Sequence, residues 1–426
     1  MKISLIIPTR SRAKYLRSSL LSAVVAAEHA ACDVEIVVVD NASDDDTADV
    51  VRGFTQPCIR YFRQPRRVSM RQNFEDALNY STGSHIVIIG DDDGVLPNGL
   101  AFLRRLIEAE DCEIYKWQVL NYFWPNSETG EQGRLSVRPL RLSGRLAKID
   151  PQSVLESFFR GRFTSYHDGG MIYHGCIARR LVERVRARSN GVYFWTSCPD
   201  VYTSIANVMA TNSKILSAHL PVTIGGASPR SNGASASKYS QSAHMDANSE
   251  YAKFLAESRT DPCLGEGAPL SSSLDVVVLS ALLTASKFQK LSAIDRNAWA
   301  KRIARGLRTV SDDIARAVAD DVRLVLGPDV VLDLDRPRST SSSQPAVSRP
   351  RKHVASPSNG TRVRNHLVNI RFSSGAATEN VANAAQLLDT ISDLDSAGAH
   401  SQTIVELRRI IGIVSRAGFG SQGAIG

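Results

Sequence analysis

The stretch His85-Ile86-Val87-Ile88-Ile89-Gly90-Asp91-Asp92-Asp93-Gly94 places three consecutive carboxylates directly after an apolar run. Adjacent carboxylates repel one another and are costly to bury, so we expect them at the end of a strand, partly open to water. If strand geometry persists, Asp91 and Asp93 face one side and Asp92 the other. Two oxygen donors on one side suit Mg²⁺ or Mn²⁺ bridging to phosphate. Alone, such a triplet is more often a solvated turn, and the preceding sequence decides between these interpretations.

The residues before this stretch alternate between strand-like and helix-like patterns. We expect buried strands over 3–7 (ending at Pro8), 34–39, 59–62 and 85–89. Helices are expected after the N-cap candidates Ser11, Ser43 or Asp44, and Ser69 (in a capping box with Gln72), with Pro97 in the first turn of a fourth. This alternation is typical of βαβ units around a parallel sheet, whose ligands bind outside the carboxyl ends of the strands.

Composition limits the function classes. At 426 residues the chain is long enough for two or three domains. The net charge of +8 arises within 336–371, where eight Lys and Arg residues occur without Asp or Glu, so the remaining chain gives no argument for a nucleic-acid partner. The sequence contains no run of about 18 apolar residues, so we expect no membrane-spanning helix. The six cysteines form no CxxC pair and no secretion signal is visible, so we expect a cytoplasmic protein, with the inner face of the membrane as a further option.

Polar residues follow each of the expected strands: Pro8-Thr9-Arg10, Asp40-Asn41, Arg63-Gln64 and Asp91-Asp92-Asp93. In a parallel sheet these positions meet at one edge, where a nucleotide would bind. The sequence has no GxGxxG and no GxxxxGK[ST] motif, which argues against an ordinary dinucleotide site or P-loop.

Four blocks carry a more specific resemblance: Ser4 to Arg10, Glu35 to Asp44, Arg71 to Phe74, and Gly90 to Asp93. In order and spacing they resemble the N-terminal half of family 2 glycosyltransferases of the GT-A fold, over roughly residues 1–225. The resemblance implies an α/β, Rossmann-like fold with a mostly parallel sheet flanked by helices. It also implies a hexosyltransferase-type enzyme that transfers a sugar, with inversion, from a nucleotide donor (a UDP-sugar first) to a saccharide or lipid-linked acceptor in surface polysaccharide synthesis.

The resemblance also assigns roles to individual residues. Asp91 and Asp93 would bind Mn²⁺ or Mg²⁺, with Asp93 the more direct ligand. The donor-binding residues that it implies are Pro8, Thr9, Arg10, Asp40, Asn41, Arg71, Asn73 and Asp92. For Arg71 and Asn73, an ordinary solvated helix face is the alternative interpretation.

Inverting transfer to a hydroxyl needs a base that accepts the proton of the acceptor. Carboxylates bound to a cation are poor proton acceptors, so a separate group is required. Asp200 opens a helical stretch and resembles the position of the catalytic Asp in this family. An Asp before a helix is also commonly an N-cap, and both roles are compatible. Asp168, followed by two glycines, is the alternative base.

Three further candidates depend on weaker signals. His219 lies where some relatives place a metal or phosphate contact, although a lone His is more often structural. His174 is a candidate for acceptor contact. The Gly- and Ser-rich segment 225–240 is either a plain linker or a lid over the donor, in which Arg230 would meet the diphosphate.

We expect four parts: a GT-A domain (1–240), a helical C-terminal segment (241–335), a disordered basic linker (336–361) and a second helical segment (362–426). Within the second helical segment we expect helices over 378–394 and 402–416. A basic amphipathic helix there would dock on an anionic membrane, and a packing helix is the alternative. Assembly into a homo-oligomer stays open.

Two other functions compete with glycosyl transfer. A nucleotidyltransferase that makes sugar nucleotides also combines an α/β nucleotide domain with a metal. It usually has a glycine-rich phosphate loop after the first strand, and Pro8 to Ser11 contains no glycine. A non-catalytic scaffold that binds nucleotide sugars is the second alternative. Donor sugar, acceptor and linkage depend on variable loops and are not readable from the motifs.

Overall fold

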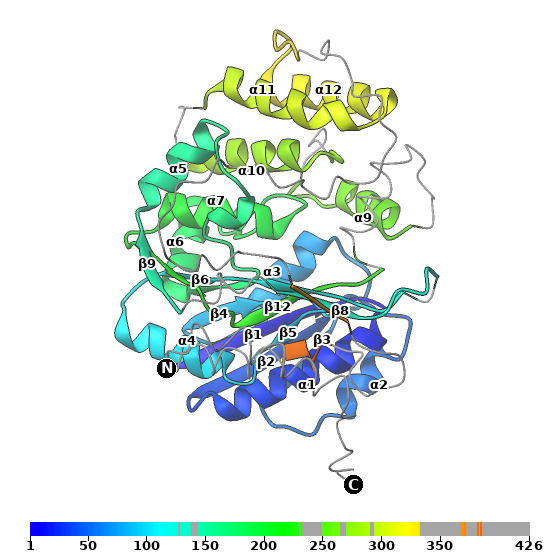
Figure 1. Cartoon of the computed structure of the whole chain (residues 1–426), viewed down its shortest axis with the longest axis vertical. Helices are drawn as coiled ribbons and strands as arrows, with labels where there is room; N and C mark the ends of the chain where they lie inside the picture. Colours follow the sequence, from blue (N-terminus) through cyan, green and yellow to red (C-terminus); the bar gives the residue numbers. More distant parts are fainter. Residues whose placement is uncertain are drawn as a thin grey trace, which may run out of the picture.

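The computed structural model describes residues 1–126, 128–137, 144–229, 231, 249–264, 270–289, 294–332, 368–371, 381–382 and 384–385. Its centre is an eight-stranded sheet (Figure 1). In spatial order the strands are β3 (Ile59–Arg63), β2 (Asp33–Asp40), β1 (Lys2–Thr9), β4 (His85–Ile88), β10 (Gly175–Ala178), β6 (Ile114–Trp117), β11 (Ile215–Ala218) and β9 (Leu146–Ile149). The first four are mutually parallel, β6 and β11 are parallel, and β10 and β9 run antiparallel to their neighbours. The predicted α/β fold with a mostly parallel sheet is confirmed.

Helices cover both faces of this sheet, which explains why its central strands are apolar on both sides. One face carries α1 (Ala13–His29), α2 (Thr47–Arg52) and α4 (Gly99–Ala109). The other carries α3 (Met70–Tyr80), α5 (Pro151–Phe159), α6 (Arg179–Arg188) and α7 (Pro199–Ala210). Helices α10 (Leu274–Gln289), α11 (Arg296–Gly306) and α12 (Asp312–Leu326) extend that second layer away from the sheet (Figure 1). Because α10 to α12 share one apolar core with α5 and α7, this C-terminal region packs directly on the first part of the chain.

A second, five-stranded sheet lies across the acidic turn that follows β4. Its order is β13 (Val368–Arg371), β8 (Arg134–Val137), β7 (Leu120–Phe123), β12 (Thr223–Ala227) and β5 (Gly94–Val95). At Gly226 the backbone of β12 comes so close that a Cβ would lie 1.7 Å from the carbonyl oxygen of Asp92. Glycine at this position therefore allows β12 to close over the carboxylates.

Several predicted element boundaries were wrong. Strand β1 continues through Pro8 to Thr9, because the fixed φ of proline fits an extended strand. Helix α1 begins at Ala13 instead of after Ser11, and its first N–H donates to Asp45 of a neighbouring loop at 2.9 Å. The helix start at Ser69 is confirmed, since its Oγ accepts from the Gln72 backbone N–H at 3.0 Å.

Two other predicted helix starts also differ. Helix α2 begins at Thr47, with Asp46 as N-cap, whereas Ser43 accepts a hydrogen bond from the Ser11 backbone N–H at 2.7 Å. Pro97 precedes α4, whose N-cap is Asn98. Ser11 and Ser43, which were predicted to cap helices, thus connect neighbouring loops instead. Such contacts between distant segments cannot be predicted from local sequence.

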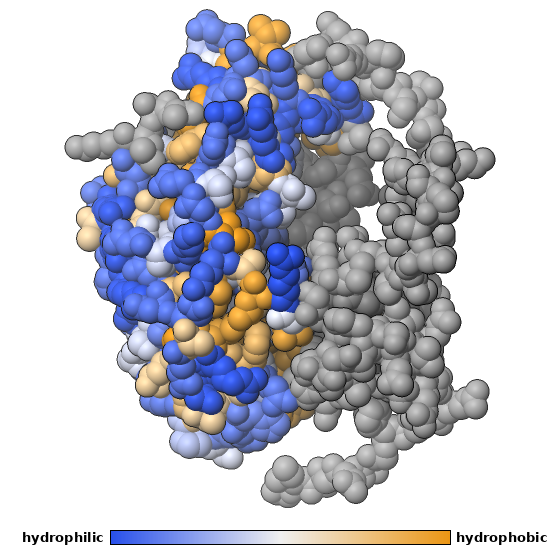
Figure 2. Space-filling view, turned by 60° about the vertical axis from the view of Figure 1, so that its left-hand side comes forward, coloured by the Kyte–Doolittle hydropathy of each residue, from blue (hydrophilic) through white to orange (hydrophobic). Residues whose placement is uncertain are grey.

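The described surface is mainly hydrophilic, with apolar residues gathered toward the middle of the face shown in Figure 2. Large apolar side chains with high exposure are few among the described residues: Leu274, Leu324 and Val331 are more than half exposed. Within the described ranges, no helix is both long enough and apolar enough to span a bilayer.

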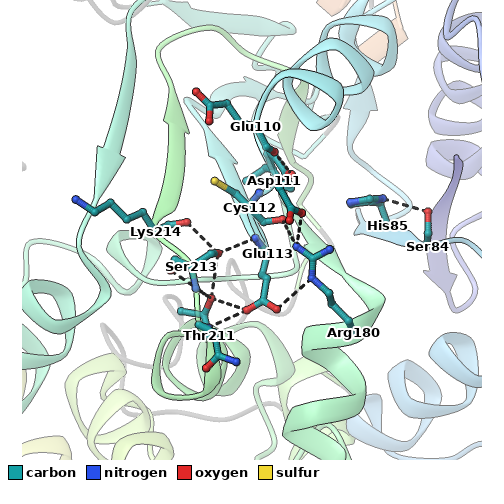
Figure 3. Close-up of polar contacts among 12 residues, drawn as sticks. Ser84, His85, Glu110, Asp111, Cys112, Glu113, Arg180, Thr211, Ser213 and Lys214 are labelled. Carbon is teal, nitrogen blue, oxygen red and sulfur yellow. Dashed lines mark hydrogen bonds and ion pairs between the residues drawn. The ribbon is translucent and has the colours of Figure 1, made fainter.

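A buried carboxylate joins β6 to the helical layer (Figure 3). Glu113 accepts two hydrogen bonds from Arg184 at 2.8 and 2.9 Å, and one each from Thr211 Oγ1 and the Asn212 backbone N–H at 2.9 Å. Arg180 also donates to it at 3.2 Å. Burial by itself would raise the pKa of Glu113, but these donors lower the pKa to about 2.

This pKa predicts how stability depends on pH. Because the folded value lies below the ordinary 4.5, the stabilisation is present above pH 4.5 and is lost as the pH falls toward 2. We expect Glu113→Gln to lower the thermal midpoint at pH 7 by on the order of 5 °C, and by less at pH 3. Thermal melts at both pH values test this, with the exposed Glu156→Gln as control. A deficit that does not change with pH would contradict it.

Candidate active site

A cavity of about 770 Å³ opens at the carboxyl ends of β1, β2 and β4. Its polar wall comes from the ends of these strands and the loops that follow them, and it includes Thr9, Arg12, Asn41, Asp91 and Asp92. Asp200, at the start of α7, lines the same cavity. Two chemically distinct regions that the sequence places more than 100 residues apart therefore share one space.

The acidic turn is buried, which corrects the expectation of partial exposure. Asp91, Asp92 and Asp93 are 2%, 4% and 1% exposed. Asp91 accepts from Thr9 Oγ1 at 2.7 Å and from Arg12 at 2.6 Å, and Arg12 also reaches Asp92 at 3.4 Å. The guanidinium and hydroxyl supply the hydrogen bonds that water would otherwise provide, so burial is tolerated.

The three carboxylates do not alternate as strand residues would. Strand β4 ends at Ile88 and the chain turns, so Asp91 and Asp92 share Arg12. Asp93 instead accepts from Tyr173 at 2.5 Å and contacts His174 Nε2 at 3.1 Å. The prediction that Asp91 and Asp93 share one side was wrong for this reason.

The environments separate the pKa values of these groups. Burial raises the pKa of Asp91 and Asp92, that of Asp92 to about 7, although Arg12 acts in the opposite direction. Burial would also raise the pKa of Asp93, but His174, Tyr173 and the Gly226 backbone N–H keep it below its ordinary value. Asp93 is therefore the member of the turn that stays ionised most readily.

Most of the predicted donor residues line the cavity: Pro8, Thr9, Arg10, Asn41, Asn73 and Asp92. Asp40 does not, because it is fully buried and accepts hydrogen bonds from Tyr61 at 2.6 Å and the Ser43 backbone N–H at 2.8 Å. Arg71 does not either. It is 1% exposed, and its Nε donates to Asp261 at 2.7 Å. Both residues have structural partners in this conformation.

Asp200 is the predicted base that the cavity contains. It is not the N-cap of α7, because Cys198 takes that position. Burial raises the pKa of Asp200, partly offset by hydrogen bonds from the Val201 backbone N–H and the Tyr166 side chain. The alternative, Asp168, accepts from the backbone N–H groups that begin its own turn, at 2.9 and 3.0 Å, and is not among the cavity-lining residues.

Comparison with known proteins gives a family match for part of the chain. Residues 4–183 match the model of the family described as glycosyl transferase family 2. This match covers less than half of the chain. The chain is 31% identical over 119 residues to the abequosyltransferase RfbV of Salmonella typhimurium, and 28% identical over 123 residues to an uncharacterized glycosyltransferase, the MG060 homolog of Mycoplasma pneumoniae. Each alignment covers 27% of this chain, and 35% and 39% of the respective relative, so little more than a third of either protein is matched.

Solved structures show a weaker likeness to this chain. Residues 1–349 of Staphylococcus aureus TarS align over 76% of this chain and 89% of that one, with a TM-score of 0.42 and 15% identity. The mannosyltransferase PcManGT from Pyrobaculum calidifontis, in complex with GDP-Man and Mn²⁺, aligns over 76% and 80%, with a TM-score of 0.38 and 18% identity. At these TM-scores neither structure supports a conclusion about ligands of this chain.

The donor chemistry of the acidic turn fits a hard divalent cation. Magnesium is usually held by one or two carboxylates together with substrate phosphates and water, not by a closed protein cage. This agrees with the observation that, within the described part of the chain, no three His, Cys, Asp or Glu side chains gather into a ready-made metal site. Of the two predicted metal ligands, Asp91 lines the cavity and would hold a cation jointly with a bound phosphate group. Asp93 is not among the cavity-lining residues, and its two oxygens accept hydrogen bonds from Tyr173 and the Gly226 backbone N–H.

His219 does not join this group. It follows β11, which lies three strands away from β4 in the sheet, a separation of about 14 Å at the usual strand spacing. It is not among the residues that line the cavity. His174, predicted to contact the acceptor, instead lies between Asp93 and Thr223 Oγ1, the latter at 2.8 Å, and is buried.

Sequence reasoning missed several residues of the family 2 site. Arg12, Tyr166 and Tyr173 all line the cavity, and each contacts one of the predicted carboxylates. No spacing in the sequence indicates which of these side chains reaches which carboxylate. Arg230, predicted to meet the diphosphate, lies outside the described residues.

Proposed function

We propose that this chain is a metal-dependent, inverting glycosyltransferase that moves a sugar from a nucleotide donor, UDP-linked in the first instance, to a saccharide or lipid-linked acceptor. One observation carries the proposal: a single cavity is lined by Asp91 and Asp92 of the acidic turn after β4 and by the separate carboxylate Asp200. The match of residues 4–183 to the model of glycosyl transferase family 2 supports the same reaction class.

The charges around the cavity support a cation requirement. Asp91, Asp92 and Asp200 line it, whereas Arg12 is already shared between two of these carboxylates and the charge of Arg10 is balanced by acidic residues of α9 (Glu250–Arg259). A diphosphate would meet a surplus of negative charge there. A bound Mn²⁺ or Mg²⁺ would neutralise the departing diphosphate.

Asp200 would act on the acceptor. Its carboxylate accepts the proton of the acceptor hydroxyl as that oxygen bonds to the anomeric carbon, while the bond from that carbon to the diphosphate oxygen breaks. The raised pKa of Asp200 makes it a stronger base than an ordinary carboxylate, which favours proton acceptance near neutral pH. The Tyr166 hydroxyl would hold the carboxylate in place.

The proposal is tested by screening nucleotide sugars for Mn²⁺-dependent release of the nucleoside diphosphate. We expect release with one donor, its loss in EDTA, and a fall of at least about 100-fold in Asp91→Asn, because Asp91 is the predicted metal ligand that lines the cavity. Asp320→Asn, on an exposed part of α12, is the matched control.

Other outcomes separate the competing functions. Pyrophosphate release from a nucleoside triphosphate and a sugar phosphate would indicate a nucleotidyltransferase. Tight binding of nucleotide sugars without any product would indicate a scaffold. Full turnover in EDTA would contradict the metal requirement while leaving glycosyl transfer in place.

The proposed location and assembly rest on sequence alone. The basic linker and the amphipathic stretch 402–416, on which membrane docking depends, lie outside the described residues. We therefore keep contact with the inner face of the membrane, and assembly into a homo-oligomer, as predictions.

A further inference from the structure

Helix α9 (Glu250–Arg259) lies outside the family 2 region, yet it forms part of the cavity wall. Glu250, Tyr251, Phe254 and Glu257 all line the cavity that contains the strand ends of the family 2 domain. Figure 1 shows α9 near one end of α3, on the helical side of the sheet. The sequence predicts a helix here but gives it no role in the site.

The clearest contact of α9 is with Arg10, in the turn after β1. The guanidinium Nη2 donates to Glu250 at 3.2 Å, and Nη1 forms a short hydrogen bond with Glu257. The side chains of Arg10 and Glu257 are 16% and 19% exposed, so water screens this pair only partly. Lys253 contacts the other oxygen of Glu250 at 3.0 Å.

The charges of this cluster decide which part of a donor it suits. Arg10 and Lys253 balance Glu250 and Glu257, so no surplus positive charge remains for a diphosphate. Both terminal nitrogens of the Arg10 guanidinium are engaged, which fixes the side chain where it lines the cavity. A guanidinium face stacks well on a planar aromatic system such as a nucleobase.

Two aromatic residues of α9 add a second flat surface. The rings of Tyr251 and Phe254 are stacked with centroids 6.0 Å apart, and both line the cavity. Stacking of a base on an aromatic side chain is a common and base-tolerant source of nucleotide affinity. Both surfaces therefore suit the uncharged end of a nucleotide better than its phosphates.

The position of α9 is itself fixed by a buried ion pair. Just beyond the helix, Asp261 accepts from Arg71 at 2.7 Å and forms a short hydrogen bond with Ser69, the N-cap of α3. Arg71 and Asp261 have side chains that are 1% and 0% exposed. Because α3 packs on the central sheet, this contact ties α9 to the same framework as the strand ends.

We propose that Glu250 and Glu257 are positioning residues that hold Arg10 against the nucleobase of the donor, which makes α9 a wall of the nucleoside subsite. This inference rests on the proposed function, since it takes a nucleotide sugar as the donor. It assigns the C-terminal helical segment a part in donor recognition, not only in packing.

The experiment measures binding of uridine, UMP and UDP to the full chain by calorimetry in the presence of Mn²⁺. We expect Glu257→Gln to weaken all three by a similar factor, about 3- to 10-fold, because a freed Arg10 must be ordered again on binding. In Arg10→Gln, adding Glu257→Gln should have no further effect on affinity, as a double-mutant cycle requires of coupled residues. In turnover, KM for the donor should rise while kcat stays unchanged.

Glu108→Gln is the matched control, because Glu108 pairs with Arg104 on the exposed side of α4, away from the cavity. Tighter binding in Glu257→Gln would show that the carboxylates compete with the donor and would overturn the proposal. So would a loss confined to UDP, which would assign Arg10 to the phosphates, or unchanged affinity with a lower thermal midpoint.

The same measurement separates this inference from the proposed function. If wild-type protein binds neither these ligands nor the corresponding guanosine and adenosine series, the donor assignment fails, and the role of α9 fails with it. If wild-type protein binds one series and the Gln variants behave like the control, only the role of α9 fails.

Discussion

Asp200→Asn is expected to lower kcat about 100- to 10,000-fold while leaving nucleotide affinity near the wild-type value. Asparagine has nearly the same shape but cannot accept the acceptor proton. Asp200 lines the cavity and Tyr166 donates a hydrogen bond to it, so the amide can occupy the same place. Single-turnover transfer assays combined with calorimetry of UDP binding measure the two quantities separately.

Asp168→Asn is the control, because the carboxylate of Asp168 caps its own turn. A modest loss, attributable to stability, is expected there. If Asp200→Asn kept wild-type turnover, Asp200 would not be the base. If Asp168→Asn lost turnover instead, the alternative base would take its place.

The same carboxylate predicts a pH profile. Transfer requires ionised Asp200, so the rate falls as the pH drops below the pKa of this group. Burial raises that pKa above the ordinary 3.8, and the acidic limb of the profile should therefore lie at higher pH than that of an exposed carboxylate. Tyr166→Phe removes a donor to the ionised form and should move the limb to still higher pH.

The second large effect concerns stability. Asp261→Ala should lower the free energy of unfolding by about 3–5 kcal/mol, because it leaves the guanidinium of Arg71 charged and buried without its carboxylate. Ser69 loses a hydrogen-bond partner at the same time. Denaturant unfolding followed by far-UV circular dichroism measures the change.

A matched pair controls this prediction. Asp320→Ala breaks the ion pair of Asp320 with Arg323, whose side chains are 74% and 56% exposed, and should cost less than about 1 kcal/mol. Replacing both buried partners, as Arg71→Met with Asp261→Leu, should recover a large part of the loss, since no unpaired charge remains. Equal costs for Asp261→Ala and Asp320→Ala would contradict the assignment.

Much of the fold follows from local pattern. Strands β1 to β4 occur where apolar runs predict them, and the start of α3 at Ser69 follows from a side chain that reaches a backbone N–H three residues on. Such signals depend on residues within a few positions of one another. They therefore also place Thr9, Asn41 and the acidic turn at strand ends, which is why most predicted donor residues line the cavity.

The partners of the charged groups were not predictable in the same way. Arg12 pairs with Asp91 across 79 positions, and Arg10 pairs with Glu257 across 247. Arg71 was predicted to contact the donor, yet the chain brings Asp261 to it across 190 positions. Which opposite charge lies within reach, and whether water is excluded from the pair, depends on how distant segments pack.

The sequence by itself therefore determined the α/β alternation and which polar residues end the strands, because backbone geometry repeats over a few residues. Only the tertiary structure decided that the acidic turn is buried under β12, that Asp200 shares its cavity, and that α9 closes one wall. Those outcomes depend on the removal of water from charged groups and on contacts between residues far apart in the sequence. Both arise only when the chain packs, so the spacing of residues along the sequence does not predict them.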